Sequence, residues 1–190
     1  MIRIARGEDA AATHAIYAPH VTDGVATFEN VLPGVDAMRE RILARLPRYP
    51  WLVWEEAGEV LAYAYAGRFR ERAAYDWIAE TSIYVHPDAQ RHGIARRLYG
   101  TLLDTMRLQG LTQAVGVITL PGTTSVAFHE SLGFAAAGVW RQCGWKLGRW
   151  WDVGVWQMEL QTATLPPPAV TPFAALAATP ALHALLGRVP

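Results

Sequence analysis

The sequence has little cysteine and no excess charge of either sign. Cys143 is the only cysteine among 190 residues, so no disulfide can form within the chain. The 17 basic residues balance the 17 acidic ones, which gives no general reason to expect nucleic acid or an anionic membrane as partner. The six histidines and one cysteine show no zinc-type spacing, so we expect no metal.

Long hydrophobic runs are also missing. No window approaches the roughly 18 apolar residues of a membrane helix, and the first residues lack the apolar core of a signal peptide. We therefore predict a soluble, cytoplasmic protein without a membrane partner. Hydrophobic residues nevertheless make up 52% of the chain, enough for one domain with a full core and a ligand cleft.

Apolar periodicity and turn signals define the expected elements. They predict strands at about 2–6, 51–55, 60–67, 75–86, 113–118, 137–146 and 151–160, and helices at about 8–20, 36–46, 94–109 and 124–132. Because strands and helices do not alternate strictly, the order favours an α+β fold with a mixed sheet covered by helices.

Residues 161–190 differ in composition from the domain expected over residues 1–160. They are rich in proline and alanine, and Arg188 is their one charge, which favours a loosely ordered tail. The alternative is that its apolar side chains dock on a groove or on a second subunit; these are Phe173, Leu176, Leu182, Leu185 and Leu186.

The most informative stretch is 80–98, where a predicted strand and a turn lead into an amphipathic helix through Gln90-x-x-Gly93-x-Ala95. Small residues at 93 and 95 let a bound group approach the backbone, and the helix start offers free N–H groups and a positive dipole end. This pattern predicts an anion site suited to a pyrophosphate, bound mainly by backbone amides. The residues of this site are Arg91, His92, Gly93, Ile94, Ala95 and Arg96.

Glu80 lies in the predicted strand just before this loop. In an extended strand, Glu80 and Ser82 share one face, and Ile83 and Val85 lie on the other. Apolar neighbours would partly desolvate the carboxylate and raise its pKa, as a general base requires. The alternative is an ordinary surface carboxylate at a strand edge.

Residues 90–95 resemble the acyl-CoA pyrophosphate loop of the GNAT superfamily of N-acetyltransferases. Further segments resemble, in the same order, its phosphinothricin / methionine sulfoximine N-acetyltransferase family: Thr27–Glu29, Tyr49–Val53, Ala62–Ala66, Arg72–Trp77, His129–Phe134 and Trp151–Gln157. The resemblance implies a mostly antiparallel central sheet with helices on both faces, splayed for acetyl-CoA. It also implies acetyl-CoA as co-substrate, direct transfer of the acetyl group to a small amino acid analogue, and a homodimer.

The resemblance assigns roles to particular residues. Glu80 falls on the family's catalytic glutamate. His129 stands where the wider superfamily commonly has a tyrosine and the phosphinothricin-like branch has histidine, and its imidazole could serve as acid, base or proton relay. The backbone of Val85 is expected to pair with the pantetheine arm. The expected contacts to the amine substrate are Phe28, Glu29, Arg70, Arg72 and Tyr75.

One position departs from the family pattern. Gly122 stands where the family usually has asparagine after Leu-Pro, which predicts either weaker acetyl-CoA binding or a substitute contact from Thr123. Two other functions stay open at this point: an N-acetyltransferase for peptide or protein amines, and a non-catalytic acyl-CoA-binding module. The presence of both Glu80 and His129 argues against the second.

Overall fold

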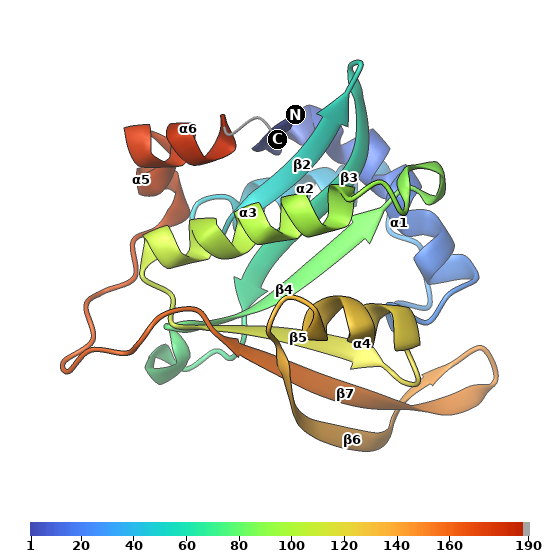
Figure 1. Ribbon diagram of the computed structural model, residues 1–190. Helices are drawn as coiled ribbons and strands as arrows, with labels where there is room; N and C mark the ends of the chain where they lie inside the picture. Colours follow the sequence, from blue (N-terminus) through green and yellow to red (C-terminus); the bar gives the residue numbers. More distant parts are fainter. Residues whose placement is uncertain (188–190) are drawn as a thin grey trace.

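The computed structural model describes residues 1–187, which fold around one seven-stranded sheet (Figure 1). The strand order is β1-β2-β3-β4-β5-β7-β6, and only β4 and β5 run parallel. This confirms the predicted mixed, mostly antiparallel sheet. The strands are β1 (Ile2–Ile4), β2 (Trp51–Glu56), β3 (Glu59–Arg68), β4 (Ile78–Val85), β5 (Gln113–Thr119), β6 (Ala135–Lys146) and β7 (Arg149–Glu159).

Helices cover both faces of the sheet, as Figure 1 shows. They are α1 (Ala10–Thr22), α2 (Val35–Arg45), α3 (Ile94–Gln109), α4 (Thr123–Glu130), α5 (Phe173–Ala177) and α6 (Pro180–Leu186). The alternation of alanine and tyrosine in β3 separates the faces, because Ala62 and Ala64 lie in the core beneath α3 while Tyr63 packs among α1 and α2.

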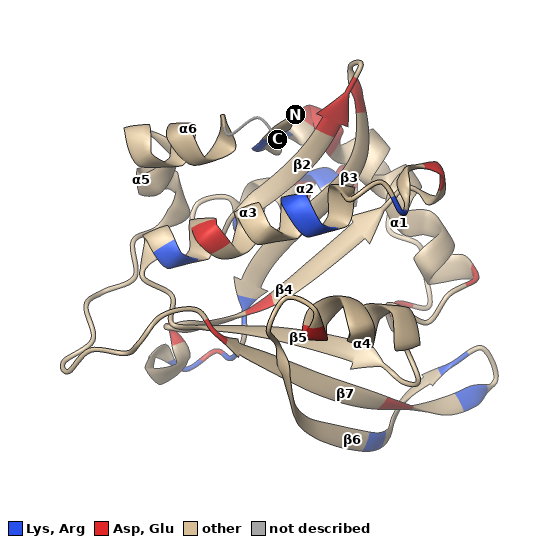
Figure 2. Ribbon diagram, in the orientation of Figure 1, with Lys and Arg blue, Asp and Glu red and all other residues tan. Residues whose placement is uncertain are grey.

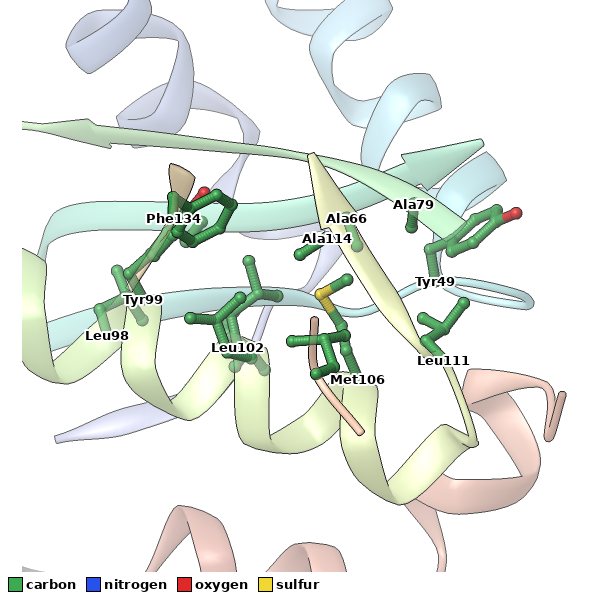
Figure 3. Close-up of a cluster of buried hydrophobic side chains, with 14 of the residues drawn as sticks. Tyr49, Ala66, Ala79, Leu98, Tyr99, Leu102, Met106, Leu111, Ala114 and Phe134 are labelled. Carbon is green, nitrogen blue, oxygen red and sulfur yellow. The ribbon is translucent and has the colours of Figure 1, made fainter. Parts of the chain in front are cut away.

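The core beneath α3 forms from the apolar face of the amphipathic helix that the sequence predicted. Leu98, Leu102 and Met106 are completely buried and face small residues such as Ala66 and Ala114 of the sheet (Figure 3). Each buried leucine or methionine contributes roughly 1.5–3 kcal/mol relative to an exposed one. This packing fixes the position of the helix that begins at the predicted anion loop.

The two parallel strands separate part-way along their length. Their pairing runs from Ile78↔Gln113 to Thr81↔Gly116, and β4 then continues to Val85 while β5 continues to Thr119. Beyond Thr81 the strands diverge, as Figure 1 shows. The sheet is therefore splayed between β4 and β5, as the resemblance implied for a protein that binds acetyl-CoA.

Strand β4 begins three residues later than predicted. Residues Ala73–Tyr75 form a 3-10 turn, in which the N–H of Tyr75 donates to the carbonyl of Arg72. The next residue, Asp76, is held 2.7 Å from the guanidinium of Arg48. These local bonds turn the chain before it can enter the sheet, and the strand starts at Ile78.

The end of the chain is not the loosely ordered tail that composition favoured. Helices α5 and α6 form a small core in which Phe173, Leu176, Leu182 and Leu185 are buried. This cluster packs against residues of the same chain, among them Ile4 and Leu46, so the docking alternative is the one observed. Composition did not predict this packing because only four apolar side chains, spaced along a segment rich in proline and alanine, are needed to form the cluster. Arg188, also named in that expectation, lies outside the described residues.

Charged residues of both signs are interspersed along the chain (Figure 2). None of the helices in residues 1–187 has the length and apolar character that a membrane crossing requires.

Candidate active site

A cleft of about 870 Å³ opens where β4 and β5 separate. Its walls come from four segments that lie far apart in the sequence: residues 81–85 of β4, the loop at 89–96, residues 117–119 of β5 and the start of α4. His20, Val25 and Ala26 close it from the side of α1. A long, narrow ligand can therefore run from the start of α3 to the point where the strands part.

The predicted anion loop lies at one end of this cleft. Gly93 caps α3 with φ +78°, a left-handed conformation that favours glycine, and a Cβ built on it would meet no atom within 4 Å. The lining includes Arg91, Gly93, Ala95 and Arg96, whereas Ile94 packs in the core and His92 is exposed. The open space beside Gly93, next to the helix N-terminus, fits a phosphate group.

A smaller polar pocket of about 280 Å³ contains Glu80. It is lined by Arg45, Tyr65, Gly67, Arg68, Glu80 and Ser82. Ser82 lines both this pocket and the cleft, so the two cavities adjoin at the residue where β4 leaves β5. A reactant in each cavity would meet there.

The carboxylate of Glu80 is partly buried on the face that the strand pattern predicted. Desolvation raises its pKa, and the positive charges of Arg45 and Arg70 oppose that rise. Thr81 points to the other side of the sheet, where its hydroxyl meets Tyr99 of α3. Glu80 is therefore a half-desolvated carboxylate at the junction of two cavities, which is the environment of a general base.

Arg45, the last residue of α2, was missed by the sequence reasoning. Its guanidinium carbon lies 4.4 Å from the ring centre of Tyr65, and Nη1 donates to the carbonyl of Ala66 at 3.4 Å. Gly67 allows the Arg45 guanidinium to lie this close to β3, since a Cβ at position 67 would be 2.5 Å from Nη1. The glycine within β3 was the available signal, because such a residue marks close approach of another group.

The predicted acceptor residues after β3 lie at the surface. Arg70 is exposed, with its guanidinium carbon 5.0 Å from the ring centre of Phe69, but its charge still acts on Glu80. Arg72 and Tyr75 are exposed and do not belong to the lining of either cavity. The structure thus brings Arg70 towards Glu80 and leaves the other two residues further out.

The loop containing Phe28 and Glu29 is fixed to β6. The buried Lys146 ammonium donates to the carbonyls of His20 at 3.0 Å and Thr27 at 2.8 Å. The ring of Phe28 covers Gly144, where a Cβ would lie 2.2 Å away. Glu29 already holds Arg41 through two bonds of 2.7 and 3.2 Å.

His129 on α4 lines the cleft but is only 5% exposed. Its Nδ1 lies 2.8 Å from the carbonyl oxygen of Ser125, and its Nε2 lies 3.1 Å from the hydroxyl of Tyr99. Burial lowers the pKa of His129, and the bond to the Ser125 carbonyl works in the opposite direction. The sequence reasoning found this histidine but not its partners.

Gly122 is closed to any side chain. Its φ is +41°, and a Cβ would lie 2.4 Å from the carbonyl oxygen of Thr119. Thr123, the next residue, lines the cleft. Within residues 1–187, no three His, Cys, Asp or Glu side chains gather as a metal site would require.

The model of the acetyltransferase (GNAT) domain family matches residues 2–155. The chain belongs to the GNAT acetyltransferase family. It is therefore an acetyltransferase, and acetyl-CoA is the co-substrate of this family.

Similar GNAT proteins include a phosphinothricin N-acetyltransferase of Streptomyces viridochromogenes, 46% identical over 121 residues, which are 64% of this chain and 66% of that protein. This alignment spans just under two thirds of that relative. An L-methionine sulfoximine/L-methionine sulfone acetyltransferase of Salmonella typhimurium is 35% identical over 87% of this chain and 97% of its own. These matches confirm the resemblance drawn from the sequence.

A solved GNAT structure is also similar. The phosphinothricin acetyltransferase of Sinorhizobium meliloti, determined in complex with AcCoA, superimposes with a TM-score of 0.85 at 35% identity, covering 91% of this chain and 96% of that one. The splayed sheet described above is therefore the GNAT fold.

Proposed function

We propose that this GNAT enzyme acetylates the amino group of a small amino acid analogue of the phosphinothricin, methionine sulfoximine or methionine sulfone type. The observation that carries the proposal is the junction at Ser82, where the long cleft meets the polar pocket of Glu80. The named relatives act on substrates of this class, which supports the choice of acceptor.

Acetyl-CoA would occupy the long cleft. Its pyrophosphate would bind the N–H groups of the loop at 91–96, to which His92 and Ile94 would contribute only backbone. The backbone of Val85, beyond the end of the β4–β5 pairing, would bind the pantetheine arm. Thr123, which lines the cleft, would supply the contact that Gly122 lacks.

Glu80 would act as the base. The thioester is already activated, so the enzyme has to fix the two reactants, remove a proton from the amine and stabilise the tetrahedral oxyanion. An α-amino group titrates near pH ~8, so a carboxylate with a raised pKa is a suitable acceptor for its proton. His129, on the cleft side, would serve the proton transfer to the leaving thiolate.

The polar pocket would hold the acidic end of the acceptor. Arg45 lines it, and the charge of Arg70 acts on Glu80 within it. A guanidinium suits a carboxylate or phosphinate. Four further residues, none of which lines either cavity, are proposed to contact the acceptor. They are Arg72 and Tyr75 from the exposed turn, and Phe28 and Glu29 from the loop fixed to β6.

A thiol-release assay with acetyl-CoA tests the function. We expect turnover with acidic amino acid analogues and little with peptides, since the pocket volume is about 280 Å³. Faster turnover of peptides would contradict the proposed acceptor class. Binding of acetyl-CoA without thiol release for any amine would indicate a non-catalytic module instead.

Replacing the base tests the mechanism. In Glu80→Gln we expect kcat to fall by about 10²- to 10⁴-fold with the fold and acetyl-CoA binding retained. Glu59→Gln, at an exposed carboxylate at the start of β3, is the matched control. An unchanged kcat in Glu80→Gln would remove Glu80 from the chemistry.

We also propose a homodimer formed through the β6–β7 hairpin. The hairpin exposes Trp140, Trp145 and Trp150 at 45%, 53% and 57%, which is unusual for such large apolar side chains. Light scattering would show a dimer that Trp145→Lys converts to a monomer; a wild-type monomer would contradict the proposal.

We propose that the protein acts in the cytoplasm. Its single cysteine, Cys143, is exposed and free, which fits a reducing compartment.

A further inference from the structure

His129 lies in a buried chain of hydrogen bonds that has a backbone carbonyl at each end. Starting from the carbonyl of Ser125, the chain passes to His129 Nδ1 (2.8 Å), and from Nε2 to the Tyr99 hydroxyl (3.1 Å). It continues to Thr81 Oγ1 (2.6 Å) and ends at the carbonyl of Val115 (2.9 Å). Tyr99, Thr81 and His129 are all at most 5% exposed.

The number of hydrogens in this chain of contacts favours the protonated form of His129. Both terminal carbonyls can only accept, so each of the four contacts needs one hydrogen from the groups in between. The hydroxyls of Thr81 and Tyr99 supply one each and a neutral imidazole supplies one, which leaves one contact without a hydrogen. A protonated imidazole supplies the missing hydrogen, and every contact is then a hydrogen bond.

We propose that Tyr99 and Thr81 are positioning residues that make His129 the proton store for the leaving thiolate, because proton uptake by its ring completes the chain. The inference rests on the proposed function only in giving His129 a part in proton transfer. The added hydrogen bond stabilises the charged ring, whereas burial by itself disfavours it.

The groups packed around the His129 ring support the view that hydrogen bonds, rather than nearby charges, control its proton affinity. The ring contacts Tyr99 of α3, Phe128 of α4, Phe134 beside β6 and Gly116 of β5, and of these only Tyr99 titrates. Two charged side chains of the same helices have other partners: Glu130 accepts from Trp156, and Arg96 donates to Ser131. Glu80 lines the pocket on the opposite face of the sheet from Thr81.

The chain also supplies a route into the cleft, since Thr81 belongs to its lining. The Thr81 hydroxyl would turn its hydrogen from the Val115 carbonyl to the thiolate sulfur and give it up there. It would then take one hydrogen from Tyr99, and Tyr99 would take the Nε2 hydrogen of the imidazolium. The sulfur becomes a thiol, the imidazole becomes neutral, and both hydroxyls are restored.

The test is a pH titration of the His129 imidazole by NMR in the free, full-length enzyme, with the signal assigned by its loss in His129→Asn. In Tyr99→Phe, protonation no longer gains a bond, and in Thr81→Val the Tyr99 hydrogen loses its acceptor. We therefore expect proton binding at His129 to weaken by about tenfold in both variants. Thr81→Ser keeps the hydroxyl and should titrate like the wild type.

Several results would overturn the proposal. One is that His129 in folded Thr81→Val binds a proton as tightly as, or more tightly than, His129 in Thr81→Ser. If the Tyr99 variant does not fold, the Thr81 pair decides the question, because valine is nearly isosteric with threonine. In the wild type at low pH, both ring N–H protons should be hydrogen-bonded, and an Nε2–H open to solvent would also contradict the proposal. These measurements need neither acetyl-CoA nor an amine, so they stay informative even if the proposed acceptor class is wrong.

Discussion

Gly116 of β5 lies directly against the imidazole ring of His129. A Cβ built on Gly116 would be 2.8 Å from Cδ2 and 2.9 Å from Nε2 of that ring, closer than real Cβ contacts allow. Gly116 is also the last residue of β5 that pairs with β4, opposite Thr81. The glycine therefore makes room for the histidine at the point where the sheet opens.

Gly116→Ala should displace the imidazole and break its bond to Tyr99. We expect kcat to fall by about tenfold or more, because small misplacements of reacting groups cost that much, while acetyl-CoA binding changes little. Gly138→Ala in β6 is the control, since a Cβ there meets nothing within 4 Å. Equal kcat values for the two variants in the thiol-release assay would contradict this prediction.

The sequence predicted the elements more completely than the contacts between them. Periodicity located the amphipathic helix α3 and the strand β3 because each pattern depends on neighbouring residues only. The place of Glu80 in a strand and of Gly93 at a helix start could be predicted because both depend on local sequence. Tyr99 could not, because its role comes from meeting Thr81 and His129, which lie 18 and 30 residues away in the chain.

Arg45 should set the pH dependence of the reaction. Its charge lowers the pKa of Glu80, so Arg45→Gln should raise that pKa further. Glu80 must be ionised to accept a proton, and activity is lost as the pH falls through its pKa. The acid limb of the kcat/KM profile should therefore move to higher pH in Arg45→Gln and stay close to wild type in Arg45→Lys. An acid limb that stays at the wild-type pH in the glutamine variant would show that Arg45 does not act on the base.

Gly122→Asn restores the residue usual in the family, yet we expect it to weaken the enzyme. Any Cβ at this position would lie 2.4 Å from the carbonyl oxygen of Thr119 and 2.7 Å from the Ile118 side chain. The backbone of the loop before α4 would have to move, and this loop lines the cleft. Calorimetric titration with acetyl-CoA should show weaker binding than in the wild type, and tighter binding would mean that the loop adapts freely.

Leu182 tests whether the C-terminal helices stabilise the domain. It is fully buried in the cluster with Phe173, Leu176 and Leu185, and the cluster packs against Ile4 and Leu46 of the domain. Leu182→Ala should lower the free energy of unfolding by about 2–5 kcal/mol, through lost burial and the cavity left behind. Leu165→Ala, at a side chain that is 96% exposed in the proline-rich segment, should change it by less than about 0.5 kcal/mol. Urea unfolding of the two variants measures the difference. If both unfold at the wild-type midpoint, α5 and α6 add no stability to the domain, and the apolar contacts of this cluster are not maintained in solution.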